Sequence, residues 1–279
     1  MKIYASSDIH VDSHALNLQW WKELHQYCSA KPPDVLIIAG DLAETICGWN
    51  EALKLFKEAN FHCLIVPGNH DLWCRHENLD SEDKLNEELP KVCLENDWVY
   101  LPDQICEIGN WTFVGSPAWY DYTLMPPNHP FTKDDFTKYE RAGRRWMDGM
   151  NCRWKDFSGS NRDSELTNHF YEKLETQLSQ ITKDNIFLVT HFPFYPEFLN
   201  FTFQNWDFEY FGAFMGSTKY RSLLHNFPIK HHICGHLHRF AQTKVADCKA
   251  YLSPVGYIKE WESLNVSKRL SQSLLTIEV

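Results

Sequence analysis

Five short pieces of the chain place aspartate, asparagine or histidine directly after a run of apolar residues. They are Ser7-Asp8-Ile9-His10, Gly40-Asp41-Leu42-Ala43-Glu44, Gly68-Asn69-His70-Asp71, Thr190-His191 and Gly235-His236-Leu237-His238. Carboxylate, imidazole and amide oxygen suit divalent ions such as Mn, Fe or Zn, whereas copper and iron–sulfur clusters favour thiolates. One such piece arises by chance, because a histidine after a strand is usually a hydrogen-bonded structural residue. All five together predict a metal site.

Seven of these side chains are candidate ligands, which is more than one ion needs. They are Asp8, His10, Asp41, Asn69, His191, His236 and His238. Two ions about 3.5–4 Å apart that share one carboxylate would use all of them, and such a pair clamps a phosphoryl group for in-line displacement. In D-x-H and H-x-H the two side chains are two residues apart, so both can reach one centre at a strand end. The pattern therefore predicts phosphoryl chemistry.

The elements that must position these side chains are short apolar strands, predicted at residues 3–5, 35–39, 63–66, 186–189 and 232–234. Helix-like stretches lie between them, at about 15–29, 50–59, 80–95, 165–182 and 217–226. Strands alternating with helices predict an α/β fold with buried sheets, whose strands present their carboxyl ends along one crevice. Shorter alternating runs at 111–114 and 274–277 predict a second sheet.

The chain has no internal repeat or Gly/Ser linker, so we expect a single domain over residues 1–279. Residues 116–164 are predicted to be an insertion or cap. Within it, Thr132 is expected to cap a helix that carries Phe136, Tyr139, Trp146 and Met150 on one side.

The chain is acidic, with 27 Lys and Arg against 37 Asp and Glu and a net charge of −10. This balance repels polyanions and disfavours nucleic acid as a partner. Because no apolar run approaches the roughly 18 residues that a membrane span needs, no membrane partner is expected. The nine cysteines are scattered without a C-x-x-C pair, which is typical of reduced thiols. Together these features predict a cytoplasmic protein.

The order D-x-H, G-D, G-N-H-D, H and G-H-x-H resembles the calcineurin-like metallophosphoesterase superfamily over residues 3–238. The resemblance implies a four-layer α/β/β/α sandwich with two mixed β-sheets. It implies that the first of two divalent ions (Mn, Fe, Zn or similar) is held by Asp8, His10, Asp41 and His238. The second would be held by Asp41, Asn69, His191 and His236, so that Asp41 bridges the two.

The same resemblance implies roles for residues that are not ligands. A hydroxide held between the metals attacks phosphorus, and His70 resembles the histidine that contacts the phosphate and supports the leaving oxygen. Glu44 stands where many relatives have an acid that orients this histidine, and Asp71 is the rival for that role.

The function predicted from these residues is a dimetal phosphodiesterase acting on a small nucleotide-like or other phosphodiester substrate. A phosphomonoesterase is the first alternative. A DNA or RNA nuclease is disfavoured by the net charge of −10. A non-catalytic scaffold ranks last, because every ligand position of the pattern is kept.

Two further stretches bear on the substrate. The aromatic segment at about 194–214 is predicted to be a packed lid or a patch through which the chain forms a homo-oligomer. Trp73 and Tyr195 lie nearest in sequence to the ligand pieces and are predicted to contact substrate. Residues 138–155 are the most basic stretch and either attract an anionic substrate or form a solvated helix face.

Overall fold

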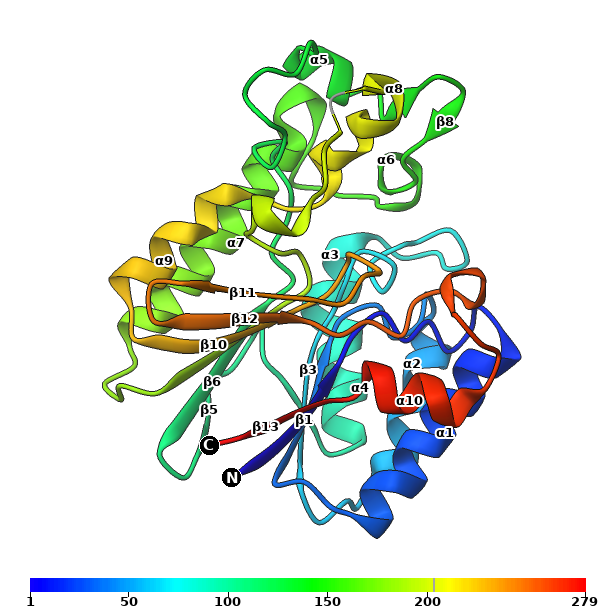
Figure 1. The fold of residues 1–279 in the computed structure, drawn as a ribbon, viewed down its shortest axis with the longest axis vertical. Helices are drawn as coiled ribbons and strands as arrows, with labels where there is room; N and C mark the ends of the chain where they lie inside the picture. Colours follow the sequence, from blue (N-terminus) through cyan, green and yellow to red (C-terminus); the bar gives the residue numbers. More distant parts are fainter. Residues whose placement is uncertain (203) are drawn as a thin grey trace.

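Two β-sheets form the centre of the computed structural model, which describes residues 1–202 and 204–279 (Figure 1). The first sheet has the order β13-β1-β2-β3-β4, with strands β1 (Lys2–Ser6), β2 (Val35–Ala39), β3 (His62–Val66), β4 (Trp98–Tyr100) and β13 (Leu275–Glu278). Strands β1 to β4 run parallel, and β13 pairs antiparallel with β1. This sheet is therefore mixed.

The second sheet is also mixed and has the order β11-β12-β10-β9-β6-β5. Its strands are β5 (Cys106–Ile108), β6 (Trp111–Ser116), β9 (Ile186–Thr190), β10 (Ile229–Cys234), β11 (Ala241–Val245) and β12 (Cys248–Leu252). Strands β6, β9, β10 and β12 run parallel, while β5 and β11 are antiparallel edges. The predicted pair of mixed sheets is confirmed, but the run at 274–277, expected in the second sheet, forms β13 of the first because it pairs with β1.

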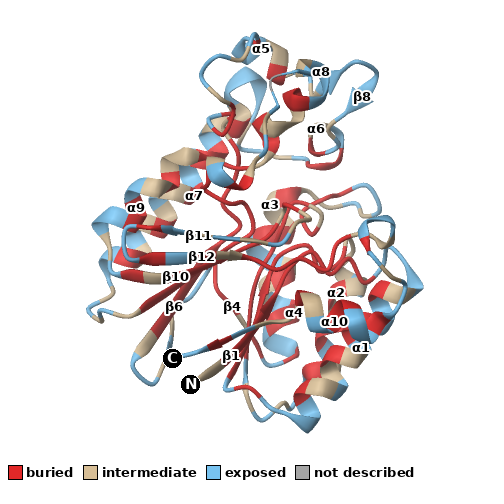
Figure 2. Ribbon diagram, viewed as in Figure 1, coloured by how far each residue is buried: buried red, intermediate tan, exposed pale blue. Residues whose placement is uncertain are grey.

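Alternate residues of each central strand face two different cores, which is why these strands are apolar throughout. Val35 and Ile37 pack with Phe187 and Val189 in the core between the sheets, whereas Leu36 belongs to the core under the helices. The central strands are accordingly drawn mostly as buried in Figure 2. A strand buried on both faces has no solvated side and loses the polar alternation of a half-exposed strand.

Helices cover the outer faces of both sheets (Figure 1). They are α1 (Ala15–Ala30), α2 (Ile46–Leu53), α4 (Leu89–Glu95) and α10 (Val266–Ser273) beside the first sheet, and α7 (Arg162–Ser179) and α9 (Arg221–Asn226) beside the second. The four-layer α/β/β/α sandwich is confirmed. Across residues 1–202 and 204–279, no helix has the length and apolar character to cross a membrane.

Helix boundaries follow local capping more closely than apolar spacing. Helix α2 begins four residues before the predicted stretch at 50–59, because the Thr45 side chain accepts a hydrogen bond from the Gly48 amide at 3.0 Å. The predicted helix at 80–95 is divided into α3 (Ser81–Asp83), a π-helical turn at Lys84–Glu88 and α4. The stretches at 15–29 and 165–182 form α1 and α7 with boundaries close to those expected.

Residues 117–161, 194–202 and 204–217, here called the outer lobe, pack together beyond the sandwich, at the top of Figure 1. The lobe contains α5 (Lys133–Phe136), β7 (Glu140–Arg141), β8 (Arg144–Arg145), α6 (Asp148–Asn151) and α8 (Trp206–Glu209). Aromatic rings join its two segments, with centroids 5.3 Å apart for Phe136 and Tyr210 and 5.4 Å for Trp146 and Phe214.

The prediction of one long helix after Thr132 is wrong. Thr132 does cap α5, but that helix ends at Phe136, and Tyr139 then adopts a left-handed φ of 52°. Ala142 and Gly143 are also left-handed, so the chain turns back and β8 pairs with β7 as a hairpin.

Candidate metal centre

Every candidate ligand lies in the loop directly after one of five parallel strands. Asp8 and His10 follow β1, Asp41 follows β2, and Asn69 follows β3, three neighbouring strands of the first sheet. His191 follows β9, while His236 and His238 follow β10, neighbours in the second sheet. Because both sheets present carboxyl ends toward the same crevice, residues far apart in the chain converge there.

The ligand loops hold their residues in unusual backbone conformations. Asp8, His10, Asp41 and His236 have φ values of 53°, 48°, 55° and 69°. Each such residue costs about 1–3 kcal/mol and persists only where surrounding contacts over-determine it. Here the Asp8 amide donates to the Gly40 carbonyl at 2.9 Å, and the His10 amide donates to the Asp41 carbonyl at 2.9 Å. Neighbouring loops therefore hold one another in position.

Asp71 secures the loops after β2 and β3 rather than orienting His70. Its two carboxylate oxygens accept from the amides of Asp41, Leu42, Ala43 and Gly68 and from Trp49 Nε1, at 2.6–2.9 Å. Gly68 leaves room for this arrangement, since a Cβ there would overlap Asp41 Oδ1. Because both of its oxygens accept hydrogen bonds from these loops, Asp71 stabilises the backbone of the site.

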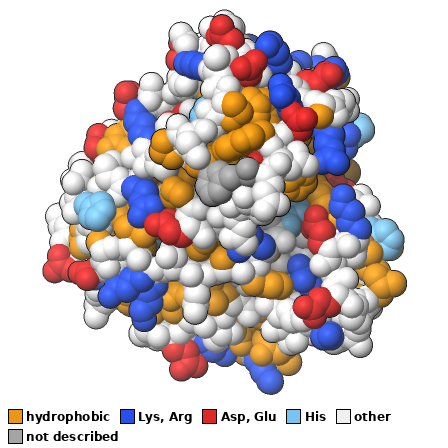
Figure 3. Space-filling view, turned by 45° about the horizontal axis from the view of Figure 1, so that its top comes forward, with side chains coloured by type: hydrophobic (Ala, Val, Ile, Leu, Met, Phe, Trp, Pro, Cys, Tyr) orange, Lys and Arg blue, Asp and Glu red, His pale blue; other side chains and the backbone are white. Residues whose placement is uncertain are grey.

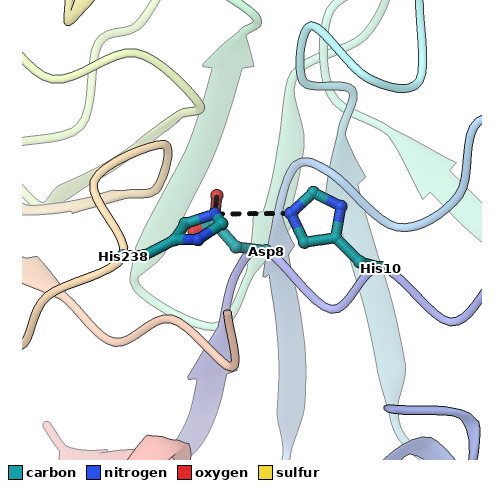
Figure 4. Close-up of side chains that lie close together, drawn as sticks. All are labelled: Asp8, His10 and His238. Carbon is teal, nitrogen blue, oxygen red and sulfur yellow. Dashed lines mark hydrogen bonds and ion pairs between the residues drawn. The ribbon is translucent and has the colours of Figure 1, made fainter. Parts of the chain in front are cut away.

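The first group of donor atoms contains Asp8, His10 and His238 (Figure 4). His10 Nε2 lies 3.3 Å from His238 Nε2, which lies 3.5 Å from Asp8 Oδ1. Asp41 Oδ2 is 3.8 Å from His10 Nε2. The four side chains expected at the first ion therefore lie together.

The second group contains Asp41, His191 and His236, with ligand atoms all within 4.8 Å of one another. His191 Nε2 lies 3.4 Å from Asp41 Oδ2 and 3.0 Å from Asn69 Oδ1. Since the same Asp41 oxygen also faces His10 in the first group, Asp41 stands between the two groups. This is the position expected of a carboxylate shared by two ions.

The remaining contacts of the histidines fit metal binding. His191 Nδ1 lies 3.0 Å from the Ala39 carbonyl, and His238 Nδ1 lies 2.8 Å from Glu260 Oε2, which leaves Nε2 of both rings for a ligand bond. His236 Nε2 is buried and has no hydrogen-bond partner among the described residues. A buried polar atom without a partner calls for an explanation, and a bound ion supplies one. The donor set fits two divalent ions with oxygen and nitrogen ligands.

Neighbouring carboxylates raise the pKa of two histidines at the centre. Burial lowers the pKa of His191, yet the facing Asp41 carboxylate raises it to about 9. Burial likewise lowers the pKa of His238, but hydrogen bonds to Asp8 and Glu260 raise it to about 10. Divalent ions must displace these protons, so metal binding is expected to weaken as the pH falls.

His70 stands beside the two groups with its side chain partly exposed. Its Nδ1 lies 3.7 Å from Glu44 Oε1, so the structure places Glu44 and not Asp71 next to this ring. Its Nε2 lies 3.3 Å from the Tyr257 hydroxyl. The His70 ring meets the His10 ring edge-on at 4.8 Å, which puts it within reach of anything bound at the first group.

A cavity of about 340 Å³ opens over the two groups. Its apolar walls are Trp73, Trp146, Met147, Met215 and Tyr257, and Arg145 adds a cation. Trp73, for which the sequence predicts a substrate contact, lies in the wall of this cavity. The matching prediction for Tyr195 is wrong, because Tyr195 is fully buried and its hydroxyl lies 2.7 Å from His232 Nδ1.

Most cations of the basic stretch at 138–155 are paired with acids. The four pairs are Lys138 with Asp135, Arg141 with Asp207, Arg145 with Glu140, and Lys155 with acids at positions 80 and 83. Acidic and basic side chains are interspersed on the face shown in Figure 3. The stretch is not a helix face, and Arg145 is its member in the cavity.

Sequence reasoning missed several side chains of the site. Tyr257 stacks on His10 with centroids 4.6 Å apart, and Glu260 orients His238. Both lie after β12, a further parallel strand whose carboxyl end faces the same crevice, and recognising that strand would have found them. Trp146 and Asp148 lie in the outer lobe, where no motif marks them.

Comparison with known proteins agrees with this architecture. The chain resembles a phosphopantetheinyl hydrolase from Mycobacterium tuberculosis, with 22% identity over 99% of this chain and 95% of that one and a TM-score of 0.72. It also resembles a protein from Thermus thermophilus, with 11% identity, coverage of 99% and 97%, and a TM-score of 0.58. At these identities the likeness establishes the fold. No curated protein sequence matches the chain.

The model of the calcineurin-like phosphoesterase family matches residues 1–240. That range contains all five ligand loops and both groups of donor atoms. The chain therefore belongs to the calcineurin-like phosphoesterase family.

Proposed function

We propose that this metallophosphoesterase is a dimetal phosphodiesterase that hydrolyses a small phosphodiester. The observation that carries the proposal is the pair of donor groups sharing Asp41 at the base of a cavity that His70 also lines. Two ions would be held by the ligands predicted from the sequence, Asp8, His10, Asp41 and His238 for one and Asp41, Asn69, His191 and His236 for the other. When bound, such ions act as Lewis acids toward the phosphoryl group and make water nucleophilic near neutral pH.

The side chains of the protein supply proton transfer and orientation. Glu44 holds the Nδ1 side of His70, which leaves Nε2 toward the cavity beside the Tyr257 hydroxyl. As the bond between phosphorus and the leaving oxygen breaks, His70 Nε2 gives its proton to that oxygen. This donation matters most for alkoxides such as those of ribose or glycerol, because they leave poorly without a proton.

The cavity supports a diester substrate over a monoester. Its 340 Å³ is at the small end of ligand pockets and is larger than a phosphate group requires. Aromatic and methionine side chains form its walls, so they fit the organic substituent of a second ester. The Arg145 guanidinium can pair with an additional negative charge on that substituent.

A phosphopantetheinyl group linked to a protein is the second candidate substrate, because it is also a phosphodiester. The relative named a phosphopantetheinyl hydrolase matches 99% of this chain, so the match extends to the outer lobe as well as the sandwich. Nucleotide diesters remain the first candidate because the cavity is lined by Trp73, Trp146 and Tyr257, on which a base can stack.

The test compares turnover of bis(p-nitrophenyl) phosphate with p-nitrophenyl phosphate, using protein stripped of metal and reloaded with Mn²⁺. Cyclic nucleotides and a phosphopantetheinyl protein complete the panel. We expect a diester preference that is abolished in Asp41→Asn. A monoester preference would replace the proposal with a phosphatase. Absence of turnover with two bound ions would favour the scaffold alternative.

A further inference from the structure

We infer that Asp148, on the outer lobe, is a positioning residue that sets the metal-binding orientation of Asn69. The inference rests on the metal centre of the proposed function and is independent of the substrate. Asp148 lies in α6 and is completely buried. It reaches the centre from outside the five ligand loops.

Asp148 accepts hydrogen bonds from three side chains that line the cavity. Its Oδ1 accepts from Asn69 Nδ2 at 2.8 Å and from Trp73 Nε1 at 2.7 Å. Its Oδ2 accepts from Trp146 Nε1 at 2.9 Å. A carboxylate accepts hydrogen bonds without donating any, so it requires each partner to present an N–H group.

This requirement decides which way the Asn69 amide faces. An asparagine amide has nearly the same shape in two orientations, but only its oxygen binds a metal ion. Because Asp148 takes the Nδ2 side, Oδ1 points to His191 Nε2 at 3.0 Å, within the second donor group. Without the carboxylate, the amide loses the contact that disfavours the reversed orientation.

The effect should be confined to the second ion. Trp146, held by Asp148 Oδ2, packs against the ring of His236 with centroids 5.7 Å apart and an interplanar angle of 77°. The lobe is also tethered to the loop after β3, since the Cys74 amide donates to the Asn151 carbonyl at 2.7 Å. Asn69 and His236 belong to the second group, while the contacts that order Asp8 and His238 come from Glu260 and neighbouring loops.

Asp163 offers a matched control in the same part of the fold. It is 1% exposed and accepts hydrogen bonds from Trp119 Nε1 at 3.1 Å and from the Tyr122 hydroxyl at 2.5 Å. It therefore resembles Asp148 in burial and in its indole donor, but it is hydrogen-bonded to none of the candidate ligands. Replacing it removes a buried carboxylate of α7 that binds two lobe side chains, and it leaves Asn69 untouched.

The experiment measures Mn²⁺ binding to metal-stripped full-length protein by equilibrium dialysis at constant pH. In Asp148→Asn, we expect the Kd of the second Mn²⁺ to rise roughly 10–100-fold, as is typical when a partner of a metal ligand is lost, with the first Kd unchanged. In Asp163→Asn, we expect both Kd values of the wild type. Thermal unfolding of both variants reports the structural effect separately.

A rescue variant distinguishes a loss of ligand orientation from a general loss of structure. Combining Asn69→Asp with Asp148→Asn replaces the Asn69 amide with a carboxylate, whose two oxygens are equivalent toward a metal ion. Both carboxylate oxygens bind metal, so orientation no longer matters. We expect this double variant to recover second-site binding to within about tenfold of the wild type. It also carries the test if Asp148→Asn alone does not fold.

Three outcomes would overturn the inference. Two wild-type Kd values in Asp148→Asn would remove the role of Asp148 and leave the proposed function standing. Equal weakening of both ions in Asp148→Asn and Asp163→Asn, without rescue by the double variant, would assign Asp148 a structural role only. Fewer than two Mn²⁺ bound to the wild type would overturn the inference and the proposed function together.

Discussion

Two buried carboxylates, Asp71 in the sandwich and Asp148 in the outer lobe, organise the same centre by different means. Asp71 accepts from four backbone amides of the ligand loops, so it fixes the path of the chain. Asp148 accepts from three side chains and fixes how they face the cavity. The sandwich thus fixes the positions of the ligands, and the lobe fixes the orientation of one ligand, Asn69, and of two cavity walls, Trp73 and Trp146.

A metal centre can therefore draw on regions with unlike sequence signals. The loops after the strands carry compact motifs, because backbone position and ligand type are both encoded within a few residues. The lobe contributes through Trp146 and Asp148, which meet the centre only after two aromatic segments have packed together. Substitutions in the two regions should therefore have unlike consequences.

The largest effect should come from Asp41 in the sandwich. Asp41→Asn removes the negative charge shared by both donor groups, so we expect loss of metal and a fall in diesterase kcat/KM of more than about 10²-fold. Metal content and turnover are measured on the same sample. Asp207→Asn, at an exposed ion pair of the lobe, is the control and should change neither.

Replacing His70 should separate proton transfer from metal binding. In His70→Asn we expect kcat to fall roughly 10²–10⁴-fold while both ions stay bound, with the larger losses for poor leaving groups. Turnover of substrates with graded leaving groups checks this. His76, also near Glu44 but exposed, provides the control His76→Asn. An equal loss for all leaving groups would contradict the proton-donor role.

The stability of the contact between the lobe and β10 should depend on pH through His232. Burial lowers the pKa of His232 to about 3, and its Nδ1 contacts the Tyr195 hydroxyl. The unfolded chain takes up this proton below about pH 6.5 and the folded protein does not, so stability is lost as the pH falls from there toward 3. This histidine should contribute up to about 1.4 kcal/mol per pH unit within that window.

Urea unfolding at several pH values between 7 and 4 tests this contribution. We expect the free energy of unfolding of His232→Gln to depend less steeply on pH than that of the wild type. His225→Gln, in α9, is the control and should retain the wild-type slope. Equal slopes for all three proteins would contradict a buried neutral imidazole.

The smallest effect should come from Arg145 at the cavity rim. Because this side chain is 49% exposed and paired with Glu140, we expect Arg145→Gln to raise KM about two- to fivefold for diesters with an extra negative charge. The kcat value should not change. Arg141→Gln, whose partner is Asp207, is the control, and steady-state kinetics of charged and neutral diesters distinguish the two.

Residues 35–39 and Tyr195 show which features can be predicted from the sequence and which cannot. Residues 35–39 were predicted as a buried strand because apolar residues on both faces are required between two packed layers. Tyr195 was misassigned because closeness in sequence to His191 does not set the direction of the chain. After Pro193 the chain enters the lobe, where the Ser217 amide donates to the Pro193 carbonyl and Tyr195 packs against His232.

The five ligand-bearing strands, the order of the ligand loops and the chemistry of their donors follow from the sequence, because apolar strand patterns and ligand type are local properties. Packing of the folded chain places Glu44 and not Asp71 next to His70, and it brings Tyr257 and Asp148 to the cavity. The bond from Asn69 to Asp148 joins residues 79 positions apart. Such partners are chosen by how the lobe packs on the sandwich, and no short stretch of chain encodes that packing.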